Sequence, residues 1–240
     1  MIETAKTKNL IEAMFEAGAH FGFTRSRRHP SAKPFLWGTK NRIEIFNLEL
    51  TSKSLEKAKE FVRNLAKEGG KILFVGGKKE AQEIIRSAAE TLGMPYVAGR
   101  WIGGTLTNFS QIRKQVTNYE NLISERDSGG FEKYTKMERL LLDRKIEAME
   151  SKFSGLVLME QIPSTLFVID PKREHIAVQE AKSVGASVVG LCGSDCNLSQ
   201  VDVGIPGNDA AIASISFFVE QIVSSFKEGL KVEVEEVENN

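Results

Sequence analysis

Short apolar runs that do not alternate with polar residues, each followed by an amphipathic helix, restrict this chain to few folds. The clearest run spans Ile72 to Val75, and the helix after it is predicted over residues 79–92. A strand that is apolar on both sides suits a parallel sheet covered by helices on both faces. The same strand–helix–strand order recurs over residues 165–191. The pattern predicts an α/β domain with a parallel sheet and right-handed crossovers.

The remaining segments complete a sheet of about five strands flanked by helices. We expect strands over residues 42–46, 71–75, 95–98, 165–169 and 187–191. Helices are predicted where apolar residues recur at helical spacing, over residues 8–17, 52–67, 79–92, 173–184 and 208–227.

The composition is that of a globular protein. A chain of 240 residues can bury a core of its own, and 41% hydrophobic with 27% charged residues excludes a disordered chain, a collagen-like repeat and a disulfide scaffold. No apolar run reaches the roughly 18 residues that span a bilayer, so we expect no membrane contact. The start, Met1 to Thr4, lacks the features of a secretory signal. We therefore expect a cytoplasmic protein.

Residues 107–153 interrupt the α/β pattern. The apolar residues Phe109, Ile112, Val116, Tyr119 and Ile123 recur at the spacing of a coiled-coil seam. A turn over residues 127–130 and a capping box at Thr135 precede a second such series. We predict an inserted antiparallel helical hairpin that projects as an arm toward a partner. Two ordinary helices of the domain are the alternative.

Charge is unevenly distributed along a chain whose formal net charge is zero. Residues 17–43, here called the basic segment, contain no Asp or Glu. The basic segment contains two histidines, several aromatic residues and six cations, Arg25, Arg27, Arg28, Lys33, Lys40 and Arg42. Cations neutralise phosphates, and aromatic rings can stack on bases or anchor the segment to the domain. RNA contact is favoured over a solvated basic loop. The C-terminal tail, residues 229–240, is acidic, and we expect it to be flexible.

Two glycine-containing loops follow predicted strands and are further candidates for binding. The turn Gly76-Gly77-Lys78-Lys79 opens a helix and could hold a phosphate, but it matches neither a P-loop nor a dinucleotide fingerprint. Its lysines could instead contact a nucleic-acid backbone or be solvated. The loop over residues 99–108 contains Arg100, Trp101, Thr105 and Asn108 at the end of a strand, where α/β folds bind ligands. Trp101 can stack on a base or belong to the core, and Asn108 can cap the next helix.

The case for catalysis or a metal is thin. Cys192 and Cys196 form only half of a structural zinc site, and the histidines do not cluster with them. We interpret both cysteines as reduced, and the loop over residues 194–209 as structural, although its carboxylates could suggest acid–base chemistry. We expect no enzymatic activity, no cofactor, no metal and no small-molecule substrate. The alternative is an α/β enzyme or nucleotide-binding module that uses Gly76-Gly77 and the loop at Gly207.

Several motifs together resemble the bacterial-type ribosomal protein S2 family. The series from Leu10 to Gly22 is similar to the family's opening signature, and Arg100 to Phe109 is similar to its most specific motif. Residues 163–185 resemble its second long signature, and Ile205 to Asp209 its C-terminal loop. The motifs occur in the family's order from about residue 8 to about residue 226.

The resemblance implies a flavodoxin/Rossmann-like domain, here residues 1–106 and 154–228, with a helical hairpin inserted over residues 107–153. It implies a structural role in the small (30S) ribosomal subunit, with 16S rRNA and neighbouring proteins as partners. The large mRNA-binding protein S1, where the organism has one, is among these partners. The candidate RNA-binding residues are Arg25, Arg27, Arg28, Lys33, Lys40, Arg42, Lys78, Lys79, Arg100, Trp101, Thr105 and Asn108.

Overall fold

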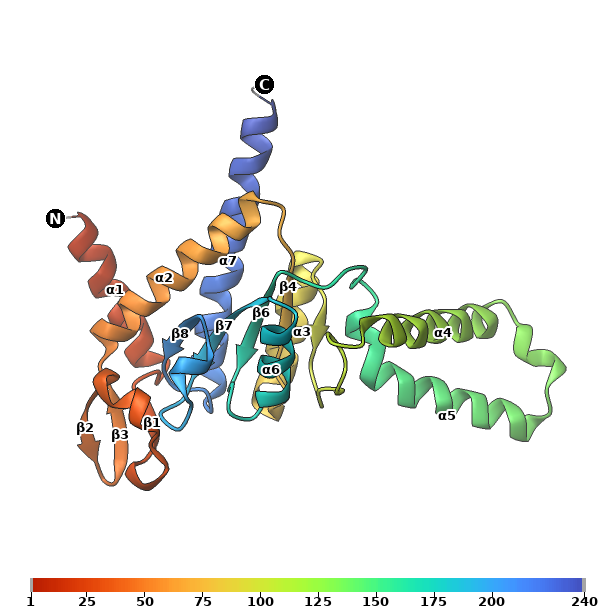
Figure 1. The fold of residues 1–240 in the computed structure, drawn as a ribbon, viewed down its shortest axis with the longest axis horizontal. Coiled ribbons are helices and arrows are strands. Elements are labelled where there is room, and N and C mark those ends of the chain that lie inside the picture. Colours follow the sequence, from red (N-terminus) through yellow and green to blue (C-terminus); the bar gives the residue numbers. More distant parts are fainter. Residues whose placement is uncertain (1, 239–240) are drawn as a thin grey trace.

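A five-stranded parallel sheet with the strand order β5-β4-β6-β7-β8 forms the centre of the molecule (Figure 1). The computed structural model describes the backbone of residues 2–238 and the side chains of residues 9–231. Taken in chain order, the five strands lie in the flavodoxin-like sequence 2-1-3-4-5, which confirms the predicted fold class. The strands are β4 (Ile72–Val75), β5 (Tyr96–Val97), β6 (Thr165–Ile169), β7 (Ser187–Cys192) and β8 (Val203–Pro206).

The two faces of the sheet explain why its strands are apolar throughout. Ile72 and Phe74 belong to a core shared with helices α2 (Leu48–Lys67), α3 (Lys79–Leu92) and α7 (Ile212–Glu238). Leu73 and Val75 point the other way, into a core that includes α6 (His175–Ser183). Because successive side chains of a strand point to opposite faces, both sets must be apolar.

The basic segment forms most of a separate antiparallel sheet, which the sequence pattern did not reveal. Its strands are β1 (Phe21–Thr24), β2 (Leu36–Lys40) and β3 (Ile43–Phe46), in the order β1-β3-β2. The strand expected over residues 42–46 therefore exists, but its place in the parallel sheet was wrong. The fifth parallel strand is β8, which lies inside the supposed structural loop. β8 was not predicted as a strand because it contains glycine and proline. An edge strand tolerates both residues, since one side of its backbone is unpaired.

Helices α4 (Phe109–Asp127) and α5 (Lys136–Phe153) lie side by side in opposite directions at one end of the molecule (Figure 1). The predicted capping box is confirmed, because Thr135 and Glu138 bond each other's backbone N–H groups. The buried residues of both helices, including Val116 and Met149, are continuous with the core under the sheet. The division into an α/β domain and an inserted coiled-coil hairpin stays a prediction.

The chain ends are helical. Helix α1 (Ile2–Glu16) precedes the basic segment, and α7 extends to Glu238, beyond the predicted end at residue 227. The side chains of residues 232–240 in the acidic tail lie outside the described residues, and the tail's flexibility stays a prediction. Short 3-10 helices occupy Arg25–Arg27, Pro30–Phe35, Gly130–Lys133, Ser154–Leu156 and Leu198–Gln200. Within the described residues, every helix is too short or too polar to cross a bilayer.

Candidate nucleic-acid interface

Lys78 occupies the place where flavodoxin-like folds bind ligands. It follows β4, beside the point where the strand order reverses between β4 and β6. Its Nζ lies 2.8 Å from Oδ2 of Asp170, which follows β6. The same Nζ lies 2.8 Å from Oδ2 of Asp209, which follows β8, and donates to the Asp209 carbonyl oxygen at 3.0 Å. One buried ammonium thus joins the carboxyl ends of three strands.

The charges in this cluster depend on one another. Burial alone would lower the pKa of Lys78, but the carboxylates of Asp209 and Asp170 outweigh it and raise that pKa. Burial, reinforced by the neighbouring Asp170 and Asp195, raises the pKa of Asp209 to about 6, although Lys78 opposes the rise. Lys78 is therefore a firmly charged partner of two carboxyl groups and is not directed at an external phosphate.

The same cluster is poorly suited to a metal ion. Asp170, Cys196 and Asp209 bring possible ligand atoms within 4.8 Å of one another. The Lys78 ammonium, however, already contacts both carboxylates. Burial, with nearby negative charge, raises the pKa of the Cys196 thiol, and burial likewise raises that of Cys192. A neutral thiol is a poor metal ligand.

The glycines near this edge serve internal packing. A side chain at Gly77 would strike the Glu174 carboxylate and the Gly99 carbonyl, and one at Gly76 would lie 2.7 Å from Ile85. At Gly207 it would press on the Phe218 ring at 3.0 Å. These contacts account for the glycines that the nucleotide-binding alternative had assigned to a phosphate.

The basic segment is anchored on the carboxyl edge of the sheet. The backbone N–H of Phe23 donates to Oγ of Ser194 at 2.8 Å, and that of His29 donates to the Ser194 carbonyl at 2.9 Å. The guanidinium of Arg27 lies 4.3 Å from the centre of the Phe23 ring, and the Lys78 ammonium lies 5.7 Å from it. Phe23 is thus an anchor, one of the two uses expected for the aromatic residues.

The six cations of the basic segment divide into two groups. Arg27 bonds Asp195 at 2.9 Å, and Arg28 bonds Glu44 at 3.3 Å. Both carboxylates are almost fully buried, with side-chain exposures of 3% and 1%, so these two arginines neutralise internal charge. The other four cations are exposed and form no ion pair within 4.0 Å among the residues whose side chains are described; they are Arg25, Lys33, Lys40 and Arg42.

Lys40 and Arg42 stand at the tip of the β2–β3 hairpin. The two residues of its turn, Asn41 and Arg42, both have positive φ, 51° and 67°. This is the type I′ turn that matches the twist of a hairpin, and glycine is usually preferred at its second position. An arginine there accepts a left-handed backbone, which costs about 1 kcal/mol or more. Arg42 therefore makes the turn less stable than glycine would, and it places a cation at the exposed tip of the hairpin.

The loop over residues 99–108 is folded around one carboxylate. Oε1 of Glu180 accepts from Nε1 of Trp101 at 3.1 Å and from the Gly104 N–H at 2.7 Å. Oε2 accepts from the N–H groups of Leu106 and Thr107 at 3.0 and 3.2 Å. Burial raises the pKa of Glu180, but these hydrogen bonds outweigh burial and lower it. Sequence reasoning missed Glu180, because its partners lie over 70 residues earlier in the chain.

The remaining candidate residues differ in accessibility. Trp101 and Thr105 are buried, so their side chains belong to the loop's interior. Asn108 is exposed at the N-cap position of α4, without the side-chain capping bond that was considered for it. Lys79 and Arg100 are exposed. Of the six candidates outside the basic segment, Lys78, Trp101 and Thr105 thus have structural contacts, while Lys79, Arg100 and Asn108 face solvent.

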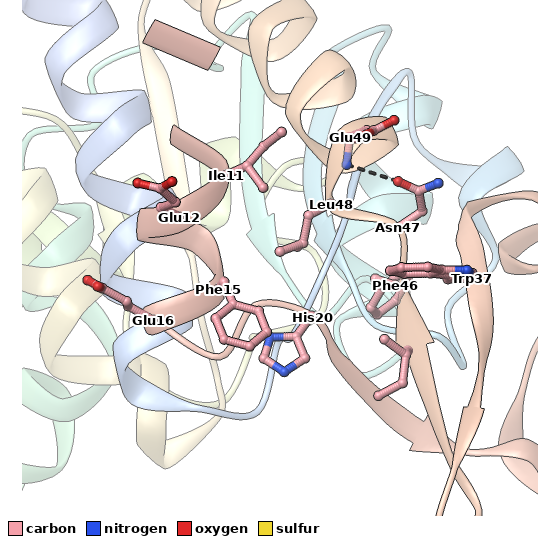
Figure 2. A pocket seen from close by; sticks show the side chains of 11 residues that line it. Ile11, Glu12, Phe15, Glu16, His20, Trp37, Phe46, Asn47, Leu48 and Glu49 are labelled. Carbon is pink, nitrogen blue, oxygen red and sulfur yellow. Dashed lines mark hydrogen bonds between the residues drawn. The ribbon is translucent and has the colours of Figure 1, made fainter. Parts of the chain in front are cut away.

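A groove lies between α1 and the β2–β3 hairpin (Figure 2). Its volume is about 590 Å³ and its apolar wall includes Phe15 and Trp37, which are 61% and 84% exposed. His20 stacks on Phe15 with ring centres 4.5 Å apart, and burial lowers its pKa. Glu12, Glu16 and Glu49 form an acidic rim.

Comparison with known proteins identifies the family. The family model for ribosomal protein S2 matches residues 14–229. The chain belongs to the ribosomal protein S2 family. Small ribosomal subunit protein uS2 of Coprothermobacter proteolyticus is 41% identical over 219 residues, which cover 91% of this chain and 82% of that protein. The proteins of the same name from Mycobacteroides abscessus and Mycobacterium leprae are 39% and 40% identical, covering 92% of this chain and 80% of each relative.

Membership in the ribosomal protein S2 family confirms the resemblance read from the motifs. It makes the chain a structural ribosomal protein of the small subunit, and the expected location on cytoplasmic ribosomes follows from it. Members of a ribosomal protein family are in general not enzymes. The residues that contact RNA and the identity of the protein neighbours stay predictions.

Replacing Lys78 by Met tests the buried cluster. The variant leaves the carboxylates of Asp170 and Asp209 buried without their cation, so the free energy of unfolding near pH 8 should fall by about 3–5 kcal/mol. The loss should be smaller near pH 5, because a buried carboxyl with a raised pKa is favoured when protonated, and this stability is lost as the pH rises through that pKa. Urea titrations at both pH values measure the effect. Lys79→Met, at the exposed neighbour, is the control, and equal losses in both variants would contradict the assignment.

Replacing Glu180 by Gln tests the carboxylate that organises the 99–108 loop. Glutamine turns an N–H₂ group toward several N–H donors, so we expect a loss of about 2–4 kcal/mol at neutral pH. Because the pKa of Glu180 is lowered by folding, its contribution is complete above the ordinary glutamate pKa and is lost as the pH falls. The difference between wild type and variant should therefore shrink below about pH 4. Glu60→Gln, an exposed site on α2, serves as control, and a pH-independent difference would refute the charge-based role.

Proposed function

We propose that this protein binds 16S rRNA through the exposed cations of the basic segment and thereby holds its place in the small ribosomal subunit without catalysing a reaction. The observation that supports this most is the display of Arg25, Lys33, Lys40 and Arg42 on an antiparallel sheet fixed to the domain. Cations free of acidic partners attract phosphates and release counterions when they bind them.

Because the sheet is fixed to the domain, these cations can contribute more to the free energy of RNA binding. The ion pairs of Arg27 and Arg28 and the bonds of Ser194 hold the segment before RNA arrives, so less conformational entropy is lost on binding. The left-handed backbone at Arg42 supports the same interpretation, because residues kept in unfavourable conformations cluster at functional sites. Arg27 and Arg28 contribute to the positive potential, but their first role is internal.

The alternative of a nucleotide-binding enzyme has less support. Its binding site would coincide with the ion cluster of Lys78. Its glycines pack against Glu174 and Ile85. Lys79, Arg100 and Asn108, which are exposed, remain candidates for RNA contact outside the basic segment.

Removing the four free charges tests the proposal. The fourfold variant should bind small-subunit rRNA more weakly than wild type. It carries Arg25→Gln, Lys33→Gln, Lys40→Gln and Arg42→Gln. The slope of log affinity against log salt should flatten by up to about 0.9 per lost phosphate contact. Filter binding over a salt series measures the slope, and cosedimentation of tagged protein with small subunits on a gradient measures incorporation in cells. Arg27 and Arg28 are spared, because their loss would leave buried carboxylates unpaired.

Two control variants separate charge from folding. The first control removes the same charge from exposed lysines on or just after α2 and should keep the wild-type slope. It carries Lys53→Gln, Lys57→Gln, Lys67→Gln and Lys71→Gln. Arg42→Gly relieves the left-handed backbone, so it should be at least as stable as wild type and yet bind RNA more weakly. An unchanged slope in the fourfold variant, or equal losses in both fourfold variants, would overturn the assignment.

We further assign the groove of Figure 2 to a neighbouring ribosomal protein, with the large mRNA-binding protein S1 as first candidate where the organism has one. An exposed apolar wall that includes Trp37 is unusual on a solvated surface and typical of protein contacts. The rim of Glu12, Glu16 and Glu49 repels phosphate and favours a partner segment with apolar anchors and flanking cations.

Replacing Trp37 by Ser tests this contact. At 84% exposure the residue adds little to stability, so the variant should fold and enter small subunits normally. Subunits purified from cells with the variant should contain less of one protein neighbour, measured by quantitative mass spectrometry of gradient fractions. Trp37→Phe should restore it. Unchanged protein composition of the subunits would rule the groove out as a docking site.

A further inference from the structure

A second groove, here called the α3–α7 groove, runs between two helices that cover the same face of the sheet. Its volume is about 560 Å³, and eleven residues line it. Ala88 and Val219 form a buried floor, while Ile84 and Val223 are partly exposed. The walls carry short polar side chains such as that of Ser224, so the apolar floor is open to another molecule. An apolar groove of this kind is a common docking place for a further helix.

The charged residues of the α3–α7 groove have no ionic partner among the described side chains. Glu83 on α3 and Glu220 on α7 are exposed, and neither carboxylate has a cation within 4.0 Å in the described part of the chain. Glu220 accepts a hydrogen bond from the Ser216 hydroxyl at 2.8 Å. Lys227, which lies about 10 Å further along the axis of α7, is likewise unpaired among these residues. Two carboxylates and one ammonium without ion pairs favour a partner of complementary charge.

Helix α2 shows how a helix packs against α7 in this protein. A side chain at Gly229 would lie 2.5 Å from the Arg63 carbonyl oxygen and 2.6 Å from Cβ of Ala66, so the two helix backbones lie close together. The Arg63 guanidinium pairs with Glu228 at 2.7 Å beside this contact. The α3–α7 groove offers the same two elements to a helix of another molecule, because its walls are short and Glu220 is without an ion pair among the described side chains.

We propose that the α3–α7 groove binds an amphipathic helix of a neighbouring small-subunit protein. This helix presents apolar side chains to the floor and a lysine or arginine to Glu83 and Glu220. It presents an acidic residue, about two turns away, to Lys227. The inference goes beyond the proposed function, because it uses neither the basic segment nor the groove of Figure 2. It needs only a place in the small subunit, which family membership supplies.

Two other occupants fit the α3–α7 groove less well. An RNA backbone would place phosphates against two carboxylates, with a single lysine to offset them. A second copy of this chain would need a larger surface, since stable interfaces use about 20–30 residues a side and eleven residues line the groove. A single helix needs less area when the rest of the ribosomal subunit already holds both proteins in place.

A crosslink from the groove identifies the occupant. Ser224→Cys places a thiol at an exposed position of the groove. Because Cys192 and Cys196 are buried with raised thiol pKa values, a photoactivatable thiol reagent should label this variant selectively at residue 224. In assembled small subunits, mass spectrometry should find the crosslink on one protein, in a helical segment with apolar and cationic residues. Ser183→Cys, exposed on α6 at the other face of the sheet, is the control and should not reach that segment.

Charge reversal tests the chemistry of the contact. Glu83→Lys with Glu220→Lys should lower the yield of this crosslink on the order of tenfold, because the variant sets cation against cation. The reciprocal change from lysine or arginine to glutamate in the crosslinked segment should restore the yield. Glu60→Lys with Glu68→Lys, at exposed positions on or just after α2, makes the same change in charge and should keep the wild-type yield. Both variants should unfold near the wild-type midpoint, since only exposed residues are replaced.

The outcomes separate this inference from the proposed function. A crosslink to rRNA, to a second copy of this chain or to no molecule at all would overturn the inference. A crosslink to a protein whose yield charge reversal does not lower would overturn it as well. If wild-type protein binds no rRNA, the proposed function fails, and the crosslink in assembled subunits still decides this inference. Trp37→Ser should leave the Ser224→Cys crosslink unchanged, because the two grooves are formed by different elements.

Discussion

The buried ion cluster around Lys78 is the interaction on which the rest of this structure depends. A single ammonium satisfies carboxyl groups at the ends of β6 and β8 from its position after β4. Those strand ends form the floor on which the basic segment lies, and Phe23 of that segment faces the same ammonium. Without Lys78, the floor would contain uncompensated buried charge, and the segment above it would lose its support.

A second buried charge, Glu180 on α6, organises the loop that leads into α4 in the same way. Its carboxylate accepts hydrogen bonds from Trp101, Gly104 and Leu106, and so fixes the conformation of that loop. In both places a largely buried charge fixes a segment that carries exposed cations. The point of the flavodoxin-like fold that could hold a nucleotide is filled by the chain itself, and the surfaces suited to large partners lie outside it.

The sequence was informative where structure depends on neighbouring residues and uninformative where it depends on distant ones. Non-alternating runs such as 72–75 predicted the sheet, and the spacing in 79–92 matched α3 at both ends. The β1–β3 sheet was not predicted because its strands are short and the segment between β1 and β2 contains two prolines. Lys78 and Lys79 look equivalent in sequence, yet one is buried and the other exposed. Only the approach of Asp170 and Asp209, about 90 and 130 residues later, separates them.

The zero net charge illustrates the same limit. Among the described side chains, six acids are buried but only one base: Glu44, Asp170, Glu174, Glu180, Asp195 and Asp209 against Lys78. Acidic residues therefore serve the interior more often than basic residues do, and the described surface is more cationic than the composition suggests. A chain that is neutral in sum can therefore still present exposed cations to an RNA. The number of charges says little about binding until it is known which of them are buried.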